Sequence, residues 1–197
     1  MPSDNFLWIP DAAKGGLLDS KAAKPEGEST DAYFGPQKKA LEVTSFSFGI
    51  SQAETSGSGS SGAGAGKAKF DEFEIKKFVD LASVPLYNAC AAGAHFPNVC
   101  LAIRKAGGAG LVYIQYIFRM VFVTSINWSG GSGDSAPEET IKFKFGAMGI
   151  RYVQQKPDGS EGTKLDGAWS VVTNKNTLVI PNLTTAAPNY VDSVPKG

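Results

Sequence analysis

LVYIQYIFRMVFVTSI, residues 111–126, is the stretch that decides the fold class of this chain. Its even positions are nearly all apolar, and its odd positions mix Gln115 and Arg119 with further apolar residues. This alternation predicts a β-strand whose two faces both need cover. The cover could come from a helix of the same chain or from another copy of the chain. The run is too short, and too polar at Gln115 and Arg119, to cross a bilayer as a helix.

Alternating segments on both sides of this strand predict further strands. We expect them at residues 6–9, 41–51, 69–78, 99–104, 141–152 and 169–173. One helix is predicted at residues 84–92, where Ser83 can cap the start, Pro85 fits the first turn and Gly93 can end it. The alternation slips across residues 146–149, which indicates a bulge or a bend between sheets. Six or seven strands with one short helix predict a mainly β fold, either a barrel or a sandwich.

The strand predicted at residues 41–51 has two different faces. Phe46, Phe48 and Ile50 lie on one face, which we expect to point into the core. The opposite face carries only small residues, namely Ser45, Ser47, Gly49 and Ser51. Residues 53–66, which follow, are mostly Gly, Ser and Ala. We interpret them as a long loop inside one domain, because a strand-like pattern resumes directly after them.

Composition and charge limit the classes of partner. The chain has 197 residues, with 19 basic and 19 acidic side chains and a formal net charge of zero. This balance argues against nucleic acid as a main partner and permits self-association. We expect one domain at residues 1–175 and a flexible C-terminal tail at residues 176–197, which has three prolines and little periodicity. The N-terminal residues show no signal peptide, so we expect synthesis in the cytoplasm and no membrane insertion.

The sequence offers no combination of residues typical of a catalytic or metal site. His95 is its only histidine, and no motif supports a catalytic role for it. Together with Cys90 and Cys100, it supplies fewer ligands than a zinc site needs. We expect both thiols to be buried and reduced, although they could pair. The glycines before Lys67 resemble a phosphate loop, but Ala68 stands where Ser or Thr is required. The chain is therefore not expected to be an enzyme or to bind a cofactor.

Several segments, in their order and spacing, resemble the haemolysin-coregulated protein (Hcp) family of type VI secretion. They are residues 42–52 (EVTSFSFGISQ), residues 62–69 leading into 70–80, residues 86–108 with IRKAGG at 103–108, and residues 129–134, 139–145 and 154–160. No single motif identifies the family, but together, in this order and spacing, the motifs are specific to it. The resemblance implies a small, tail-tube-like β-barrel of two packed sheets with one short α-helix. It also implies rings of six copies that stack into a hollow tube, which a contractile sheath propels into a target cell and which can carry effectors.

The resemblance further implies roles for two groups of residues. Ser45, Ser47 and Ser51 would face the lumen and contact cargo, and Glu54, Ser58, Ser60 and Lys67 of the long loop would contact the next ring. The implied partners are further copies of the chain and the spike, sheath and effector proteins. The protein would leave the bacterial cytoplasm by a route that needs no signal peptide.

The chain also departs from the family pattern. Residues 11–24 form a longer first loop than the family has, and the tail after Lys175 extends beyond the usual end. The alternative function is a monomeric β-barrel that binds a small ligand. The mass in solution would distinguish the two, because only the tube protein requires a ring.

Overall fold

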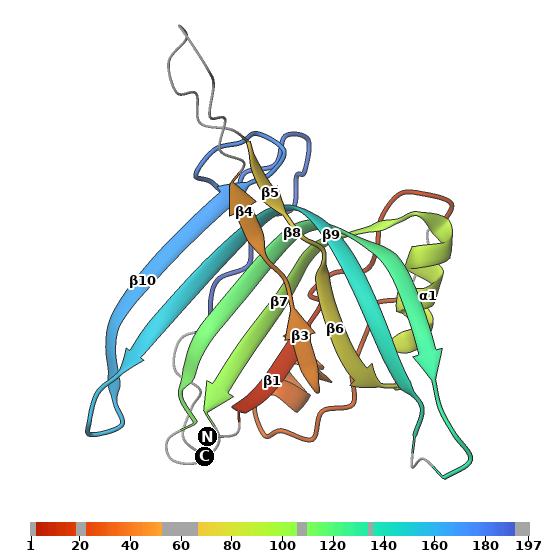
Figure 1. Cartoon of the computed structure of the whole chain (residues 1–197), viewed down its shortest axis with the longest axis horizontal. Coiled ribbons are helices and arrows are strands. Elements are labelled where there is room, and N and C mark those ends of the chain that lie inside the picture. Colours follow the sequence, from red (N-terminus) through yellow and green to blue (C-terminus); the bar gives the residue numbers. More distant parts are fainter. Residues whose placement is uncertain (1–2, 19–22, 53–66, 106–109, 134–135, 192–197) are drawn as a thin grey trace, which may run out of the picture.

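The computed structural model describes residues 3–18, 23–52, 67–105, 110–133 and 136–191. The elements are β1 (Ser3–Trp8), the π-helix η1 (Phe34–Lys38), β2 (Leu41–Glu42), β3 (Ser45–Ser47), β4 (Ile50–Gln52), β5 (Ala68–Phe70), β6 (Phe73–Phe78), α1 (Ser83–Ala92), β7 (His95–Lys105), β8 (Val112–Ser129), β9 (Glu138–Gln155) and β10 (Glu161–Ser170). The sheet curves around the core, α1 lies at one end of the long axis and β10 at the other (Figure 1).

The main sheet closes on itself through one short stretch of chain. Its strand order is β2-β1-β7-β8-β9-β6-β3, with β10 beside β9. Its two ends, β2 and β3, are consecutive pieces of residues 41–47. Within this stretch, Val43 N donates to Asn5 O on β1 at 3.0 Å, and Thr44 N donates to Lys76 O on β6 at 2.8 Å. The structure therefore confirms a mainly β barrel, with one α-helix in the described part of the chain.

The interior of the barrel is filled with aromatic side chains. Phe73, Phe118 and Phe143 are fully buried. The ring of Phe73 stacks on Phe118 at 4.4 Å and on Phe143 at 5.6 Å between centroids. Phe46 and Phe48 are partly buried and pack against this cluster, as the alternation predicted. These stacked rings therefore occupy the centre of the barrel.

The predicted break in the alternation at residues 146–149 lies where β9 stops pairing with β6 and begins to pair with β10. Residues 138–143 of β9 pair with β6, and residues 147–155 pair with β10. On the adjacent strand β8, Met120 has a left-handed backbone with φ of 53°. The alternation of β8 changes phase there, so Val121 and Val123 join Phe118 in the core. The inward-pointing residues therefore change from the even position Phe118 to the odd positions Val121 and Val123 across Met120.

The opposite face of β1, β7 and β8 carries a second apolar cluster, which residues of the same chain cover. Cys100 and Ile117 are buried in this cluster together with Val191, and Phe34 of η1 covers another part of it. The cover needed by the strand apolar on both faces thus comes from the loop before β2 and from the C-terminal segment. The helix packs on the later part of β8, where Leu86 and Ala89 join Val121 and Val123 in the core.

The C-terminal segment, residues 176–191, has no regular secondary structure but packs on the barrel, where we expected a flexible tail. Ile180 and Val191 are buried. A Cβ on Gly146 would lie 3.0 Å from Ile180, and one on Gly149 would lie 2.7 Å from the hydroxyl of Tyr190. The two glycines of β9 therefore allow the segment to approach the sheet closely.

Three further predictions about elements are corrected by the structure. The strand predicted at residues 41–51 is divided into β2, β3 and β4. The last strand is Glu161–Ser170, so it ends where the strand at residues 169–173 was expected to begin. The N-cap of α1 is Ala82 without a side-chain cap, whereas Gly93 ends the helix with φ of 64°, as predicted.

Candidate functional site

The two serines of β3 lie on an exposed face of the barrel. Ser45 and Ser47 are exposed, and Phe46 between them points toward the core. Across the antiparallel ladder, Ser45 lies opposite Lys76 and Ser47 lies opposite Glu74. Because paired residues share a face, the serines belong to a wall that also contains charged side chains.

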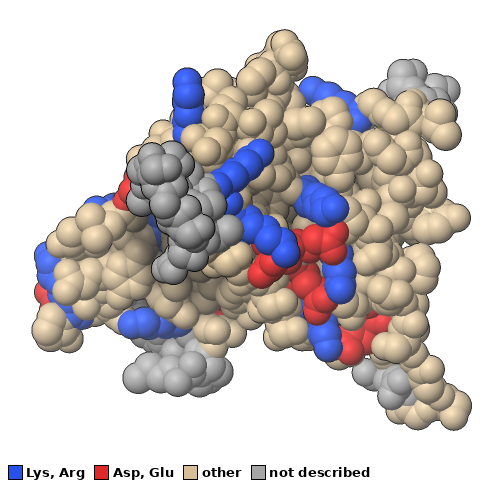
Figure 2. All heavy atoms as spheres, turned by 45° about the horizontal axis from the view of Figure 1, so that its top comes forward, with Lys and Arg blue, Asp and Glu red and all other residues tan. Residues whose placement is uncertain are grey.

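Two of the charged side chains on this wall form an ion pair. Glu74 lies opposite Lys142 in the next ladder, and their side chains form an ion pair of 3.4 Å. Figure 2 shows acidic and basic side chains next to one another on the face that it presents. The expectation of a small, uncharged face therefore holds for Ser45 and Ser47 themselves but not for their surroundings. The ion pair balances the charges of Glu74 and Lys142, and Lys76 adds a further positive charge opposite Ser45.

The structure does not bring Ser51 to Ser45 and Ser47. The chain leaves the barrel at Gly49, whose carbonyl accepts a hydrogen bond from Asp71 N at 3.0 Å. Residues 50–52 then form β4, which pairs only with β5 in a separate two-stranded sheet that projects from the barrel rim (Figure 1). Ile50 is consequently 63% exposed, so its predicted place in the core is wrong.

The candidate ring-contact loop begins and ends at this projecting sheet. Glu54, Ser58 and Ser60 fall in residues 53–66, which lie outside the described residues. Lys67 is described and exposed, directly before β5. The predicted loop is thus attached at one rim of the barrel.

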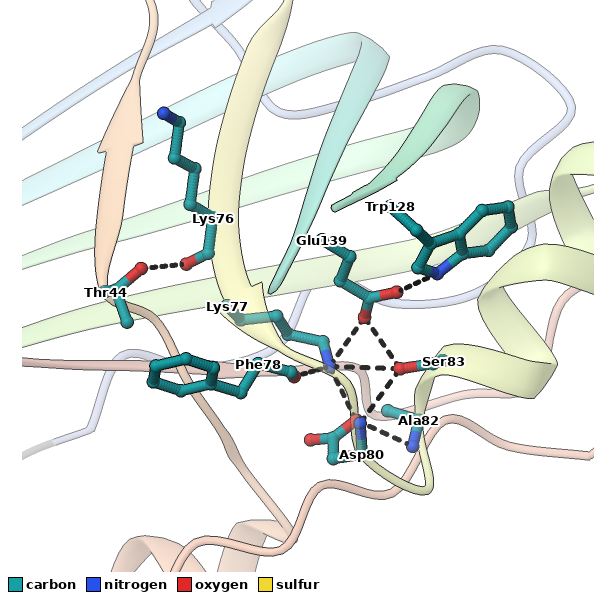
Figure 3. Close-up of polar contacts among 9 residues, drawn as sticks. All are labelled: Thr44, Lys76, Lys77, Phe78, Asp80, Ala82, Ser83, Trp128 and Glu139. Atoms are coloured by element: carbon teal, nitrogen blue, oxygen red, sulfur yellow. Dashed lines mark hydrogen bonds and ion pairs between the residues drawn. The ribbon is translucent and has the colours of Figure 1, made fainter. Parts of the chain in front are cut away.

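A buried polar cluster, which the sequence analysis missed, joins α1 to the barrel (Figure 3). Lys77 is 1% exposed and Glu139 is fully buried, and Lys77 Nζ lies 2.7 Å from Glu139 Oε1 and 2.6 Å from Asp80 Oδ1. Ser83 Oγ donates to Glu139 Oε1 at 2.7 Å, and Trp128 Nε1 donates to Glu139 Oε2 at 2.8 Å.

The strand phase of β6 explains why the cluster exists. Lys77 shares the inward face with Phe73 and Ile75, and an unpaired buried ammonium would be costly. Its Cα partner on β9 is Glu139, which supplies the opposite charge. Ser83 adds a hydroxyl from the first residue of α1. The cluster fixes the helix and the indole of Trp128 relative to the sheet.

His95 and the two cysteines show the environments of structural residues. Burial, with Lys14 nearby, lowers the pKa of His95, and its ring lies 5.4 Å from Phe122. Both thiols are free; Cys100 is buried, which raises its pKa, whereas Cys90 is only partly buried. No group of three potential metal ligands occurs among the described residues. No helix in the described ranges is long and apolar enough to span a membrane.

Known proteins resemble the chain in both sequence and fold. A family model described as type VI secretion system effector, Hcp, matches residues 6–152. The protein hcp1 of Pseudomonas aeruginosa is 31% identical over 110 residues, which cover 55% of this chain and 68% of that protein.

Two solved structures extend this similarity over most of the fold. One is described as a type six secretion system protein; it has 32% identity and a TM-score of 0.75, and the match covers 89% of this chain and 100% of the other. Hcp1 from Salmonella typhimurium has 28% identity and a TM-score of 0.68, with 90% and 100% covered. The chain therefore belongs to the Hcp family of type VI secretion proteins.

Proposed function

We propose that this protein is the structural tube subunit of a type VI secretion system. Six copies close a ring, and the rings stack into a hollow tube that a contractile sheath propels into a target cell. The observation that carries the proposal is the match over residues 6–152 to the Hcp family, together with a fold that covers a solved relative completely. The protein is secreted as part of this tube and requires no signal peptide.

The exposed face of β3 supports a role as channel wall. Ser45 and Ser47 present small hydroxyls there, and the nearby charges of Glu74 and Lys142 are paired with each other. A wall that presents small polar side chains at these positions lets effector proteins pass without binding them tightly. Ser51, which sits on the separate β4–β5 sheet, belongs with the stacking region at the rim, next to the loop that contains Glu54, Ser58 and Ser60.

The alternative, a monomeric barrel that binds a small ligand, has less support. Such a barrel needs a cavity inside. Here the interior is occupied by the stacked rings of Phe73, Phe118 and Phe143. A cleft of about 600 Å³ lies instead on the surface, beside β1 and Arg104.

Electron microscopy of the purified, negatively stained protein tests the proposal. We expect rings with a central hole, and at high concentration short stacks of them. Particles of the size of a single 20.7 kDa chain, without a hole, would refute the tube function and favour the ligand-binding barrel.

A further inference from the structure

An exposed apolar surface covers the outer side of α1. Val84 and Tyr87 are three residues apart in α1, so they lie on one side of the helix, and Leu81 lies just before the helix begins at Ser83. All three are exposed, with Val84 at 64%. The exposed Trp128 of β8 continues this surface, because its ring lies 6.1 Å from that of Tyr87. We call these four residues the helix patch.

The helix patch is rigid and carries no charge. Residues 83–92 contain no Asp, Glu, Lys or Arg, and Asn88 is an exposed polar residue beside Val84. A surface helix normally carries charged residues on its solvent side. Glu139 holds the indole of Trp128, and Ser83 ties the start of the helix to the same carboxylate. The patch is therefore prearranged for a partner, which reduces the entropic cost of binding.

A second exposed apolar surface lies on β9 and β10. Leu165 and Tyr152 are directly opposite each other in the ladder, so their side chains are adjacent on one face. Leu165 is 68% exposed and Tyr152 is also exposed. We call these two residues the strand patch.

The strand that carries Leu165 is itself poorly covered. Among the described strands, β10 pairs only with β9, and residues 163–167 are exposed on both faces. A long uncovered edge strand is a hazard for uncontrolled association unless another element covers it. The strand patch and its edge therefore point to a contact with another molecule.

The charges around the strand patch are compatible with an apolar contact. Arg151 and Asp166 form two hydrogen bonds of 2.7 Å, and Lys164 lies 2.9 Å from Glu161. In each pair, one positive and one negative side chain of β9 and β10 balance each other. The strand patch and the helix patch therefore match each other in polarity, and association between them separates no ion pair.

The two patches lie at opposite ends of the molecule. In Figure 1, α1 is at one end of the longest axis and β10 is at the other. The two patches of one copy cannot meet, but each can be covered by the other patch of a second copy. Such a head-to-tail contact is heterologous, and repeated contacts of this kind close a ring.

We propose that the helix patch of one copy packs against the strand patch of the next copy and that this contact closes the ring. This inference rests on the proposed tube function, which requires a ring but does not say which surfaces form it. The partner is a second copy of the same chain, because the chain itself supplies two apolar surfaces of matching polarity at opposite ends.

Mixing two single variants tests the proposal directly. Leu165→Asp destroys the strand patch and leaves the helix patch intact, and Val84→Asp does the reverse. Both side chains are exposed, so both variants should fold, which circular dichroism and thermal melting will check. Each variant alone is expected to run as a monomer in size-exclusion chromatography with light scattering. An equimolar mixture should form a heterodimer of twice the chain mass, because only one pair of intact patches remains between the two variants.

The matched control is Leu17→Asp, at an exposed leucine outside both patches, which should form rings like the wild type.

Disulfide trapping gives a second readout that does not depend on loss of assembly. Val84→Cys and Leu165→Cys are combined in a Cys90→Ala background, which removes the native thiol of α1. Mild oxidation should produce a reducible ladder of dimers and larger species in denaturing gels. The pair Leu17→Cys with Leu165→Cys should remain monomeric in the same gels.

The outcomes separate this inference from the proposed function. If the wild type forms rings, but both Asp variants still assemble and the Val84–Leu165 pair does not cross-link, the inference is wrong and the tube function stands. If the folded wild type is a monomer at micromolar concentration, both fail. Monomeric single variants whose mixture forms the heterodimer would establish the contact.

Discussion

Ser47 and Phe48 are adjacent residues with opposite surroundings. Ser47 is exposed on the proposed channel wall, so Ser47→Gln should change the free energy of unfolding by no more than about 0.5 kcal/mol. Phe48 contacts the rings of Phe73, Tyr116 and Phe118 at 4.9–5.8 Å. Phe48→Ala should therefore cost about 3 kcal/mol, the low end for such truncations because the ring is only partly buried.

Urea denaturation of both variants, with co-purification of luminal cargo, checks the orientation of β3. The glutamine repeated around the channel should reduce cargo while rings persist. The reverse pattern, an unfolded Ser47→Gln and a stable Phe48→Ala without cargo, would show that the strand faces the other way.

Asp31 gives the fold a pH dependence that can be measured. Burial raises the pKa of Asp31, but hydrogen bonds from Phe34 N and Tyr33 N and the nearby Arg104 outweigh this effect, so its pKa lies below the ordinary 3.8. A lowered pKa in the folded state means that the carboxylate stabilises the protein above the unfolded-state pKa. This stabilisation is lost as the pH falls through the folded-state value.

Asp31→Asn should therefore lower the free energy of unfolding by about 1–3 kcal/mol at neutral pH, because it removes charged hydrogen bonds. The difference from wild type should shrink as the pH falls below 3.8. Urea denaturation of both proteins, at the same protein concentration and at neutral and acidic pH, measures this difference in the free energy of unfolding. A difference that stays constant with pH would mean that the charge of Asp31 contributes nothing.

At the scale of elements, the C-terminal segment is held by side chains that bind its backbone. Gln115 is buried; its Nε2 donates to Val191 O at 2.8 Å, and its Oε1 accepts from Val191 N at 2.6 Å. Arg119 donates to Leu178 O at 2.8 Å and also to Thr185 O. These bonds hold the segment over the second apolar cluster, where burial raises the pKa of Tyr190 to about 12.

Gln115→Leu should release the end of this segment. It leaves the N–H and C=O of Val191 without partners, which costs about 1–3 kcal/mol if they stay buried. Detachment would uncover Cys100, so we expect a thiol reagent to label Cys100 faster than in the wild type. Gln154→Leu, at an exposed glutamine of β9, is the control and should not change labelling. Equal labelling rates in all three proteins would show that Gln115 does not hold the segment.

The projecting β4–β5 sheet allows the role of the long loop to be tested separately. These two strands pair with each other, so replacing residues 53–66 by a short Gly-Ser turn should leave the barrel and the single ring intact. Sedimentation and electron microscopy should then show rings with weakened stacking. Failure of the shortened chain to fold, or unchanged stacking, would contradict the proposed role of the loop.

Local alternation in the sequence predicted much of the barrel but not the places where the backbone leaves it. The pattern predicted that Phe46 and Phe48 point into the core, and the structure confirms both. Ile50 was misplaced because the chain turns out of the barrel at Gly49. The change of phase in β8 at Met120 could not be predicted, because the residue type does not indicate its left-handed backbone.

Contacts between residues far apart in the chain could not be predicted from the sequence pattern. Lys77 follows the inward phase of β6, but a lysine there is tolerated only because Glu139 faces it from another strand. Ile180 and Val191 lie in a stretch without periodicity, so only the docked structure shows their burial. The sequence predicted one exposed face with Ser45, Ser47 and Ser51. Only Ser45 and Ser47 share a strand, β3, because Ser51 lies on β4 in a different sheet.

At the scale of the whole molecule, the case for a ring rests on the ends of the barrel. Residues 111–126 are apolar on both faces, so the sequence suggested that another copy of the chain could cover this strand. In the structure, the loop before β2 and the C-terminal segment cover its outer face. Two apolar surfaces that remain exposed lie at opposite ends of the described molecule: the helix patch at one end and the strand patch with its edge at the other.

The mass of the purified wild-type chain in solution tests the central claim most directly. A tube subunit should form a closed ring, so light scattering at micromolar concentration should give a mass near six times the 20.7 kDa chain. The value should stay the same on moderate dilution, because a closed ring has no free ends at which to lose subunits one at a time. A folded species of 20.7 kDa under the same conditions would contradict the account.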